Sequence, residues 1–209
     1  MMCSKKLSYL ILTLGVSLIF AMGAAARERP SVGASISNIT FTDVEGHEAS
    51  LDQYFDRVIV LSFSDRTSSV RLQEWMEPAN LTLFKHQPNL RMAYVSIADV
   101  TSVPSLFHGI VRRVIKSVSQ SAHKKLAQTY RDHNLQLGQA QRVLHVVPDW
   151  RGDHLARFGL DDAEKYTLWI IHKGVVVAVF NEDHPDLKAR YVSAIRKIVT
   201  QSPLSWSKQ

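Results

Sequence analysis

Short apolar runs alternate with segments of helical periodicity along most of the chain. Runs rich in β-branched and aromatic residues predict five main strands, at residues 57–63, 90–100, 143–147, 166–171 and 175–180. The run Val58-Ile-Val-Leu61 is continuous, which is typical of a strand buried on both faces of a mainly parallel sheet. The last two strands meet at His172-Lys-Gly174, which predicts a hairpin. A further short strand is expected at residues 38–41, followed by a turn at Glu45-Gly46.

Apolar positions at helical spacing predict the helices between these strands. The first helix follows Ser68 or Ser69, either of which can serve as its N-cap, and Pro78 is expected to kink or end it. The second begins near Leu106 as a clear amphipathic helix, and a weaker pattern continues to Gly138. The third covers residues 187–199. Alternation of strands and helices in this order predicts an α/β domain with helices on both faces of the sheet.

The first 26 residues have the composition of a targeting segment. Lys5 and Lys6 precede an uncharged run, residues 7–26, which ends in Ala24-Ala-Ala26. This order of charged, apolar and small residues predicts a cleavable signal peptide and a periplasmic or secreted protein. The alternative is an uncleaved N-terminal helix that anchors the protein in a membrane. Residues 27–37 are predicted to form an exposed arm, and residues 201–209 a C-terminal tail.

Cysteine usage and charge narrow the chemistry. The chain has one cysteine, Cys3, so removal of residues 1–26 leaves no thiol, no disulfide and no thiolate metal site. The formal net charge of +6 falls to +4 without Lys5 and Lys6, a modest excess typical of solvated surface. No nucleic-acid-binding motif accompanies it, so no nucleic-acid partner is expected. The nine histidines show no compact ligand spacing, so no metal and no cofactor are predicted.

Three stretches of the chain resemble the redoxin branch of the thioredoxin-like superfamily, which includes exported thiol-disulfide proteins and peroxiredoxins. They are Phe41–Phe63, with its short strand, turn and buried strand, Val143–Leu160, and the hairpin around Gly174. The resemblance covers residues 38–200. It implies a three-layer α/β/α domain with a mixed central sheet, an N-terminal redoxin-type extension and a helical insertion at about residues 101–141.

The chain departs from this family where the family carries its chemistry. The resemblance places Ser68 and Arg71 at the two cysteine positions of the Cys-x-x-Cys motif, and Tyr166 at the position of the facing cis-proline. A cis bond before a residue other than proline costs about 2.5–4 kcal/mol, so Tyr166 is expected to be trans. Serine forms no thiolate and no reversible disulfide. Thiol-disulfide exchange and cysteine-based peroxide reduction are therefore not expected.

Two polar clusters are candidate binding sites. The first is a candidate anion or ligand site at a helix N-terminus, where backbone N–H groups and the helix dipole favour negative charge; its members are Asp65, Arg66, Thr67, Ser68 and Arg71. The other interpretation of this cluster is a capped helix with exposed charges. The second cluster is a candidate partner surface on the basic helix, with the residues Arg112, Arg113, Lys116, Lys124, Lys125 and Arg131.

The basic helix is a candidate to bind another exported protein or to lie on an anionic surface. We expect its apolar residues to pack on the sheet while the cations face water; these apolar residues are Leu106, Ile110, Val114 and Val118. Membrane attachment is expected only if residues 1–26 are retained. The predicted function is a non-catalytic binding or scaffold protein, and the alternative is a ligand-binding protein or enzyme with a non-thiol site at residues 65–71.

Overall fold

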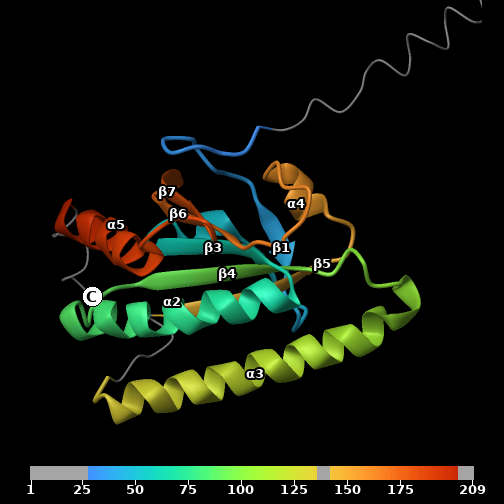
Figure 1. The fold of residues 1–209 in the computed structure, drawn as a ribbon, viewed down its shortest axis with the longest axis horizontal. Helices are drawn as coiled ribbons and strands as arrows, with labels where there is room; N and C mark the ends of the chain where they lie inside the picture. The colour runs from blue at the N-terminus through green and yellow to red at the C-terminus, as the bar shows by residue number, and fades with distance from the viewer. Residues whose placement is uncertain (1–27, 136–141, 202–209) are drawn as a thin grey trace, which may run out of the picture.

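A mixed sheet of five strands lies at the centre of the molecule, in the order β5-β4-β3-β6-β7 (Figure 1). β3 (Val58–Ser64), β4 (Met92–Asp99) and β5 (Arg142–Asp149) run parallel. β6 (Thr167–His172) pairs antiparallel with β3, and β7 (Val175–Asn181) pairs antiparallel with β6. All seven residues of β3 are buried, because this central strand is covered on both faces. The continuous apolar run in the sequence therefore marks the middle of the sheet.

The computed structural model describes residues 28–135 and 142–201. The predicted signal peptide, residues 1–26, lies outside this part of the chain, as do residues 202–209 of the predicted tail and the end of the helical pattern at Gly138. Within the described residues, no helix combines the length and the apolar character that a membrane crossing requires.

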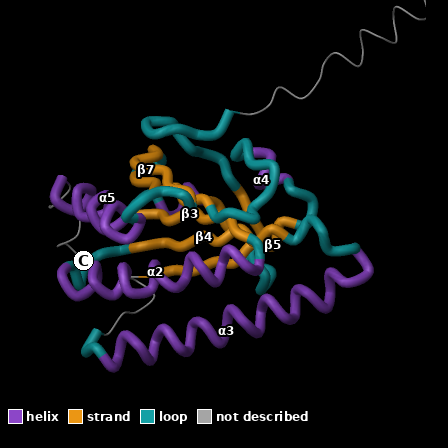
Figure 2. The backbone as a smooth tube through the Cα atoms, viewed as in Figure 1, coloured by secondary structure: helices purple, strands orange, loops and turns teal. Residues whose placement is uncertain are grey.

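Helices and a small hairpin cover the two faces of the sheet, so the domain has three layers (Figure 2). On one face α2 (Arg66–His86) and α5 (Leu187–Gln201) pack against Val58, Val60 and their neighbours. The other face is covered by α4 (Asp153–Arg157), the 3-10 helix η1 (Leu51–Tyr54) and a small hairpin, which pack around Ile59, Leu61 and Phe63. The predicted three-layer α/β/α arrangement is confirmed.

The small hairpin consists of β1 (Thr40–Thr42) and β2 (Glu48–Ser50), joined by a turn at residues 43–47. The turn was predicted at Glu45-Gly46, and Gly46 has the positive φ of 94° that favours glycine. Its strand β2 and the 3-10 helix were not foreseen, because three- and four-residue elements carry too little periodicity.

The first helix, α2, differs from the prediction at its N-terminus. Its N-cap is Asp65 rather than Ser68 or Ser69, so the helix begins directly after β3. Of the two outcomes expected at Pro78, a kink or an end, the helix does not end there and continues to His86. Proline in a helix interior costs about 3 kcal/mol or more. The burial of Ala79, Leu83 and Phe84 beyond the proline offsets that cost.

The basic helix corrects a second expectation. The short 3-10 helix η2 (Ser105–Phe107) leads into α3 (His108–Asp132), which links the parallel strands β4 and β5. The apolar residues that were expected to pack on the sheet are instead exposed: Leu106, Ile110, Val114 and Val118. The reason is that α3 packs through another face and mainly through its C-terminal half, where Tyr130 is buried against Phe84 of α2. Its N-terminal half projects past the N-terminal end of α2 (Figure 1).

The segment predicted as an exposed arm lies along the edge strand β7. Gly33 and Ile36 donate backbone hydrogen bonds to Val176 and Gly174, at 2.8 and 2.7 Å. Most side chains between residues 28 and 37 are exposed, but Ile36 is buried in the core. Pairing of this kind protects an edge strand that would otherwise offer free N–H and C=O groups.

A network of hydrogen-bonded side chains connects the β1–β2 hairpin to the sheet. Nδ1 of His145, on β5, lies 2.9 Å from Oδ2 of Asp43, and its Nε2 lies 2.8 Å from the hydroxyl of Tyr54. Burial acts to raise the pKa of the Asp43 carboxyl, but hydrogen bonds from His145, from His47 and from backbone amides outweigh it and lower that pKa. Asp43 is thus an ionised, buried acceptor that connects the hairpin to β5.

The hydrogen-bonded network around Asp43 predicts an acid-sensitive contribution to the stability of the protein. Because the pKa of Asp43 is lowered by folding, the contribution is complete above the ordinary carboxyl pKa of 3.8 and is lost as the pH falls through the lower native value. Asp43→Asn should lower the free energy of unfolding at pH 7 by about 1–3 kcal/mol and should remove this component of the acid transition. Urea unfolding between pH 7 and pH 2.5 measures both effects.

Asp183→Asn is the matched control, because Asp183 is exposed and its ion pair among the described residues is with the exposed Lys165. Its effect should stay within about 0.5 kcal/mol. Equal losses in the two variants would contradict a special role for Asp43.

Candidate functional site

The junction of β3 and α2 is the place where the resemblance puts a pair of reactive cysteines. Here Asp65 caps the helix: its Oδ1 accepts a hydrogen bond from the Ser68 amide at 2.6 Å. In return the Ser68 hydroxyl accepts one from the Asp65 amide at 2.9 Å. This reciprocal capping box satisfies N–H groups at the start of the helix and places a carboxylate there.

Ser68 is fully buried, and its hydroxyl donates its proton to a backbone carbonyl oxygen. Besides accepting from Asp65, Oγ donates to the carbonyl oxygen of Ala163 at 2.8 Å, in the loop before β6. Activation of a serine nucleophile requires a neighbouring base that takes the hydroxyl proton, and a carbonyl oxygen cannot do this. Ser68 therefore joins α2 to the loop and offers no nucleophile.

Arg71 is held by the same region of the fold. Its guanidinium binds the Glu182 carboxylate through Nε and Nη2, with Nη2 at 2.9 Å from Oε2, and Nη2 also donates to the carbonyl oxygen of Glu164 at 2.9 Å. The hydrogen bond to Glu182 raises the pKa of Arg71 above its usual value. Because a carboxylate already occupies the planar donor edge of the guanidinium, Arg71 is committed to an internal ion pair.

Tyr166 precedes β6 and lies on the same loop. Its hydroxyl accepts a hydrogen bond from Nε1 of Trp75 at 3.0 Å, and burial raises its pKa. The described residues contain no cis peptide bond, so the prediction of a trans bond at Tyr166 is confirmed. The fold thus gathers the three positions assigned by the resemblance around residues 163–166, through contacts of Ser68 with Ala163 and of Arg71 with Glu164.

The five residues of the candidate anion site divide into two groups. Arg66 and Thr67 are exposed on the first turn of α2. Asp65, Ser68 and Arg71 are engaged in the capping box, the loop contact and the Glu182 pair. An arriving anion would meet one exposed guanidinium and a carboxylate already at the helix N-terminus. The geometry therefore corresponds to the capped-helix interpretation.

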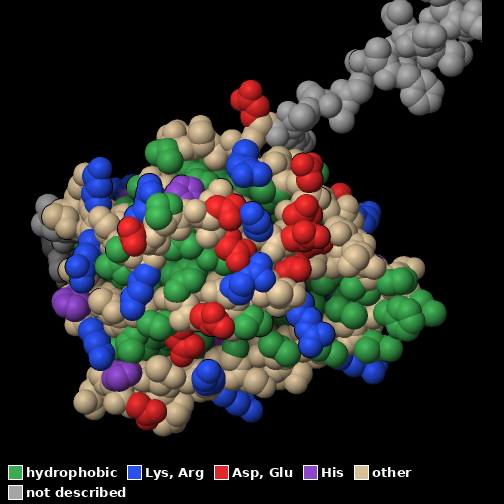
Figure 3. Space-filling view, viewed as in Figure 1, with side chains coloured by type: hydrophobic (Ala, Val, Ile, Leu, Met, Phe, Trp, Pro, Cys, Tyr) green, Lys and Arg blue, Asp and Glu red, His purple; other side chains and the backbone are tan. Residues whose placement is uncertain are grey.

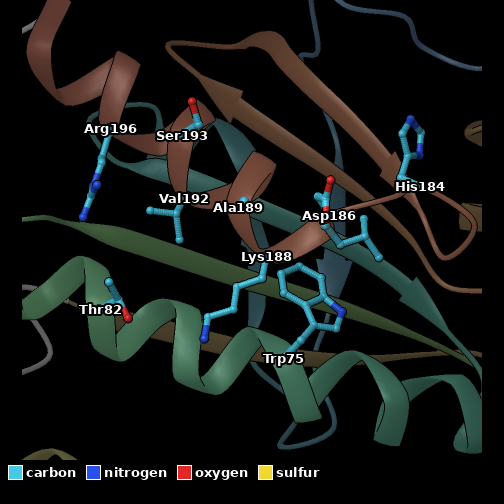
Figure 4. Close-up of a pocket in the computed structure, with 10 residues that line it drawn as sticks. Trp75, Thr82, His184, Asp186, Lys188, Ala189, Val192, Ser193 and Arg196 are labelled. Atoms are coloured by element: carbon cyan, nitrogen blue, oxygen red, sulfur yellow. The ribbon is translucent and has the colours of Figure 1, made fainter.

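A groove that sequence patterns did not indicate opens between α2 and α5, with a volume of about 760 Å³ (Figure 4). Trp75 and Thr82 line it from α2, and Lys188, Val192 and Arg196 line it from α5. Trp75 connects this groove to Tyr166 through their hydrogen bond. The two walls lie more than 100 residues apart in sequence, so only the packing of α5 on α2 creates the groove.

A second cluster that sequence analysis missed is formed by Asp43, Glu45 and His47, whose potential metal-ligand atoms lie within 4.8 Å of one another. The alternate spacing of these residues in the hairpin turn was the available signal. The turn itself accounts for the arrangement, because Asp43 accepts from the amides of Glu45 and His47, each at 2.9 Å, as well as from the two imidazoles. Both carboxylate oxygens of Asp43 are thereby used.

The candidate partner surface lies on a single helix. All six cations are on α3 and are exposed: Arg112, Arg113, Lys116, Lys124, Lys125 and Arg131. The guanidinium of Arg131 donates a hydrogen bond to the side-chain oxygen of Gln128 on the same helix. The exposed apolar residues of α3 accompany these charges.

The buried hydroxyl of Ser68 provides a test of its structural role. Ser68→Ala removes half of the capping box and leaves the Ala163 carbonyl without its partner, so we expect a loss of about 1–3 kcal/mol in the free energy of unfolding. Ser69→Ala is the control, because the Ser69 hydroxyl donates only to the carbonyl of Arg66 at an exposed position. The control should change the free energy by about 0.5 kcal/mol or less. Urea titration of both variants decides, and no loss in Ser68→Ala would refute this role.

Comparison with family models and with curated protein sequences finds no match. Solved structures do match. A protein assigned as the thiol:disulfide interchange protein DsbE of Chlorobium tepidum is 14% identical, with 80% of this chain and 97% of that chain covered and a TM-score of 0.50. Peroxidoxin BcpB of Mycobacterium tuberculosis is 17% identical, with 81% of this chain and 99% of that chain covered and a TM-score of 0.49.

At such low identity a structural likeness speaks for the fold and not for an activity. The likeness to the Chlorobium tepidum structure agrees with the mixed five-stranded sheet and the helices on both of its faces. The resemblance of Phe41–Phe63, Val143–Leu160 and the Gly174 hairpin pointed to this fold. The chain therefore has a thioredoxin-like fold, and it lacks the Cys-x-x-Cys motif.

Proposed function

We propose that this chain is an exported thioredoxin-like protein that acts by binding rather than by thiol chemistry. The observation that carries the proposal is the state of the cysteine positions: Ser68 is buried and bonded to Ala163, and Arg71 is paired with Glu182. The chain's only cysteine, Cys3, precedes the whole domain and belongs to the predicted signal peptide. Its loss with that segment would leave a protein that contains no sulfur nucleophile.

The chemistry of dithiol exchange explains why these two positions matter. A thiolate at a helix N-terminus attacks a disulfide, and a second thiol resolves the mixed disulfide that results. In this chain the first position carries a hydroxyl that donates to a carbonyl, and the second carries a guanidinium. Neither group can form or break a disulfide, and neither reduces a peroxide.

What remains is a rigid scaffold that presents surfaces. The core of the sheet, the groove between α2 and α5, and the exposed cations of α3 are all present without a thiol. A scaffold or binding role needs only such surfaces. Export is supported by the sequence of residues 1–26, in which charged, apolar and small residues follow one another.

The alternative is a ligand-binding protein or enzyme with a non-thiol site at residues 65–71. One observation favours a ligand near this region: the groove reaches Trp75, which bonds to Tyr166. The internal bonds of Asp65, Ser68 and Arg71 count against chemistry at the turn itself. We therefore rank this alternative below the binding role.

A redox assay of two proteins tests the proposal. The full-length chain and its Cys3→Ser variant should both fail to reduce insulin disulfides with dithiothreitol and to consume hydrogen peroxide above the protein-free rate. The physical reason is that residues 28–201 offer no thiolate. A thioredoxin and a peroxiredoxin serve as positive controls in the same buffers.

The two proteins separate the ways in which the proposal can fail. Turnover by the native chain alone would identify Cys3 as a nucleophile. Turnover by both would reveal a catalytic group other than sulfur. Either result would overturn a purely binding function.

A further inference from the structure

The 3-10 helix η2 and the N-terminal half of α3 together expose a line of large apolar side chains. We call these residues the α3 stripe: Leu106, Phe107, Ile110, Val114 and Val118. Leu106 is 84% exposed and Val114 is 56% exposed, although both carry side chains that normally avoid water. Positions 110, 114 and 118 follow one another at intervals of four and form a row along α3, and Leu106 of η2 comes four residues before Ile110. In Figure 3 apolar side chains gather at the edge of the molecule where η2 meets α3.

The rest of the fold does not cover the α3 stripe, because α3 packs through another side. Ser119 and Tyr130 are its buried residues, and Val111, Ile115 and Leu126 are half-buried. Tyr130 contacts Phe84 of α2, and Arg142 of β5 lies over the Tyr130 ring. The helix therefore has two apolar faces, one that fastens it to the domain and one that is free within the described structure.

Positive charge borders the α3 stripe. Arg113 follows Ile110 by three residues, so it lies along one edge of the row, whereas Lys116 lies farther round the helix. Lys124 and Lys125 follow beyond Val118. Residues 105–134 carry six cations against one acid, Asp132, a net charge of +5.

We propose that the α3 stripe docks on an anionic lipid bilayer, with the apolar row in the boundary between headgroups and acyl chains. A helix with apolar residues on one side and Lys and Arg beside them binds such surfaces in two ways: its apolar side chains are buried among the lipids, and its cations are attracted to the anionic headgroups. A second copy of this chain fits poorly, because two stripes in contact would bring two strongly positive helices together. The apolar side chains that gather where η2 meets α3 lie on a protruding part of the molecule, which suits contact with a planar surface (Figure 3).

This inference goes beyond the proposed function, since lipid docking does not depend on the state of the cysteine positions. The redox assay and a vesicle assay fail or succeed independently. Because residues 7–26 are uncharged and largely apolar, binding of the whole chain to vesicles is not a sufficient readout. The experiment must report on α3 itself.

A fluorescent probe at one position gives that report. In the full-length chain with Cys3→Ser, an environment-sensitive nitrobenzoxadiazole label is attached at Val114→Cys. A matched protein carries the label at Ser193→Cys, an exposed position of α5. With vesicles of phosphatidylcholine containing 30% phosphatidylglycerol, the Val114 label should shift to the blue and the Ser193 label should not. Vesicles of phosphatidylcholine alone should produce little shift at either position.

Charge variants of the labelled protein test the electrostatic part. Arg113→Gln with Lys125→Gln should weaken vesicle binding about thirtyfold, since each cation near an anionic surface contributes about fivefold. Lys188→Gln with Lys197→Gln on α5 removes the same charge elsewhere and should leave the binding curve unchanged. All substituted positions are exposed, so circular dichroism and the urea midpoint should match those of the parent protein.

Several outcomes would overturn lipid docking. One is no shift at Val114, or an equal shift at Ser193. Another is a shift that appears without vesicles and grows with protein concentration, which would identify a second copy as the occupant. A third is a shift with polyglutamate but not with vesicles, which would identify an acidic protein partner. Equal shifts with neutral and anionic vesicles would show that the cations do not contribute to binding and would contradict docking on an anionic bilayer in particular.

Discussion

The burial of β3 on both faces is the constraint on which the rest of the structure depends. One face packs Phe63 against Trp169 and Phe158, with ring centroids 5.4 and 4.9 Å apart, and the other packs Val58 and Val60 against α2 and α5. Because this strand is held on every side, its C-terminal end has a fixed position. The start of α2, the loop that faces it and the groove beside Trp75 all take their places from that end.

At this fixed junction the chain carries polar groups that satisfy one another. In a thiol enzyme the free N–H groups and dipole of such a helix would stabilise a thiolate. Here the Asp65 carboxylate supplies the negative charge, Ser68 is bonded to the facing loop, and Arg71 is neutralised by Glu182. The same contacts that would hold a reactive group in place now hold two parts of the scaffold together, so the loss of the nucleophile does not loosen the fold.

The helix between β4 and β5 shows the opposite situation, in which a surface is left unsatisfied. A crossover helix needs one apolar face to pack on the domain, and α3 meets this need with residues such as Tyr130 and Leu126. The additional row from Leu106 to Val118 stays largely exposed in the folded domain. Exposed apolar rows of this kind mark interaction surfaces. The charge around this one is what directs our proposal to an anionic membrane.

The sequence by itself determined the five strands of the central sheet and the fold class, because the continuous run at Val58–Leu61 and the hairpin at Lys173-Gly174 are local patterns with few alternatives. It also determined that no cysteine stands at the β3–α2 junction. Only the tertiary structure decided the partners: that Arg71 meets Glu182 and Asp43 meets His145, each across about 100 residues. It also decided which side of α3 is buried. Helical periodicity shows that an apolar face exists, but α3 has two such faces. Only packing against α2 and β5 determines which of them is buried.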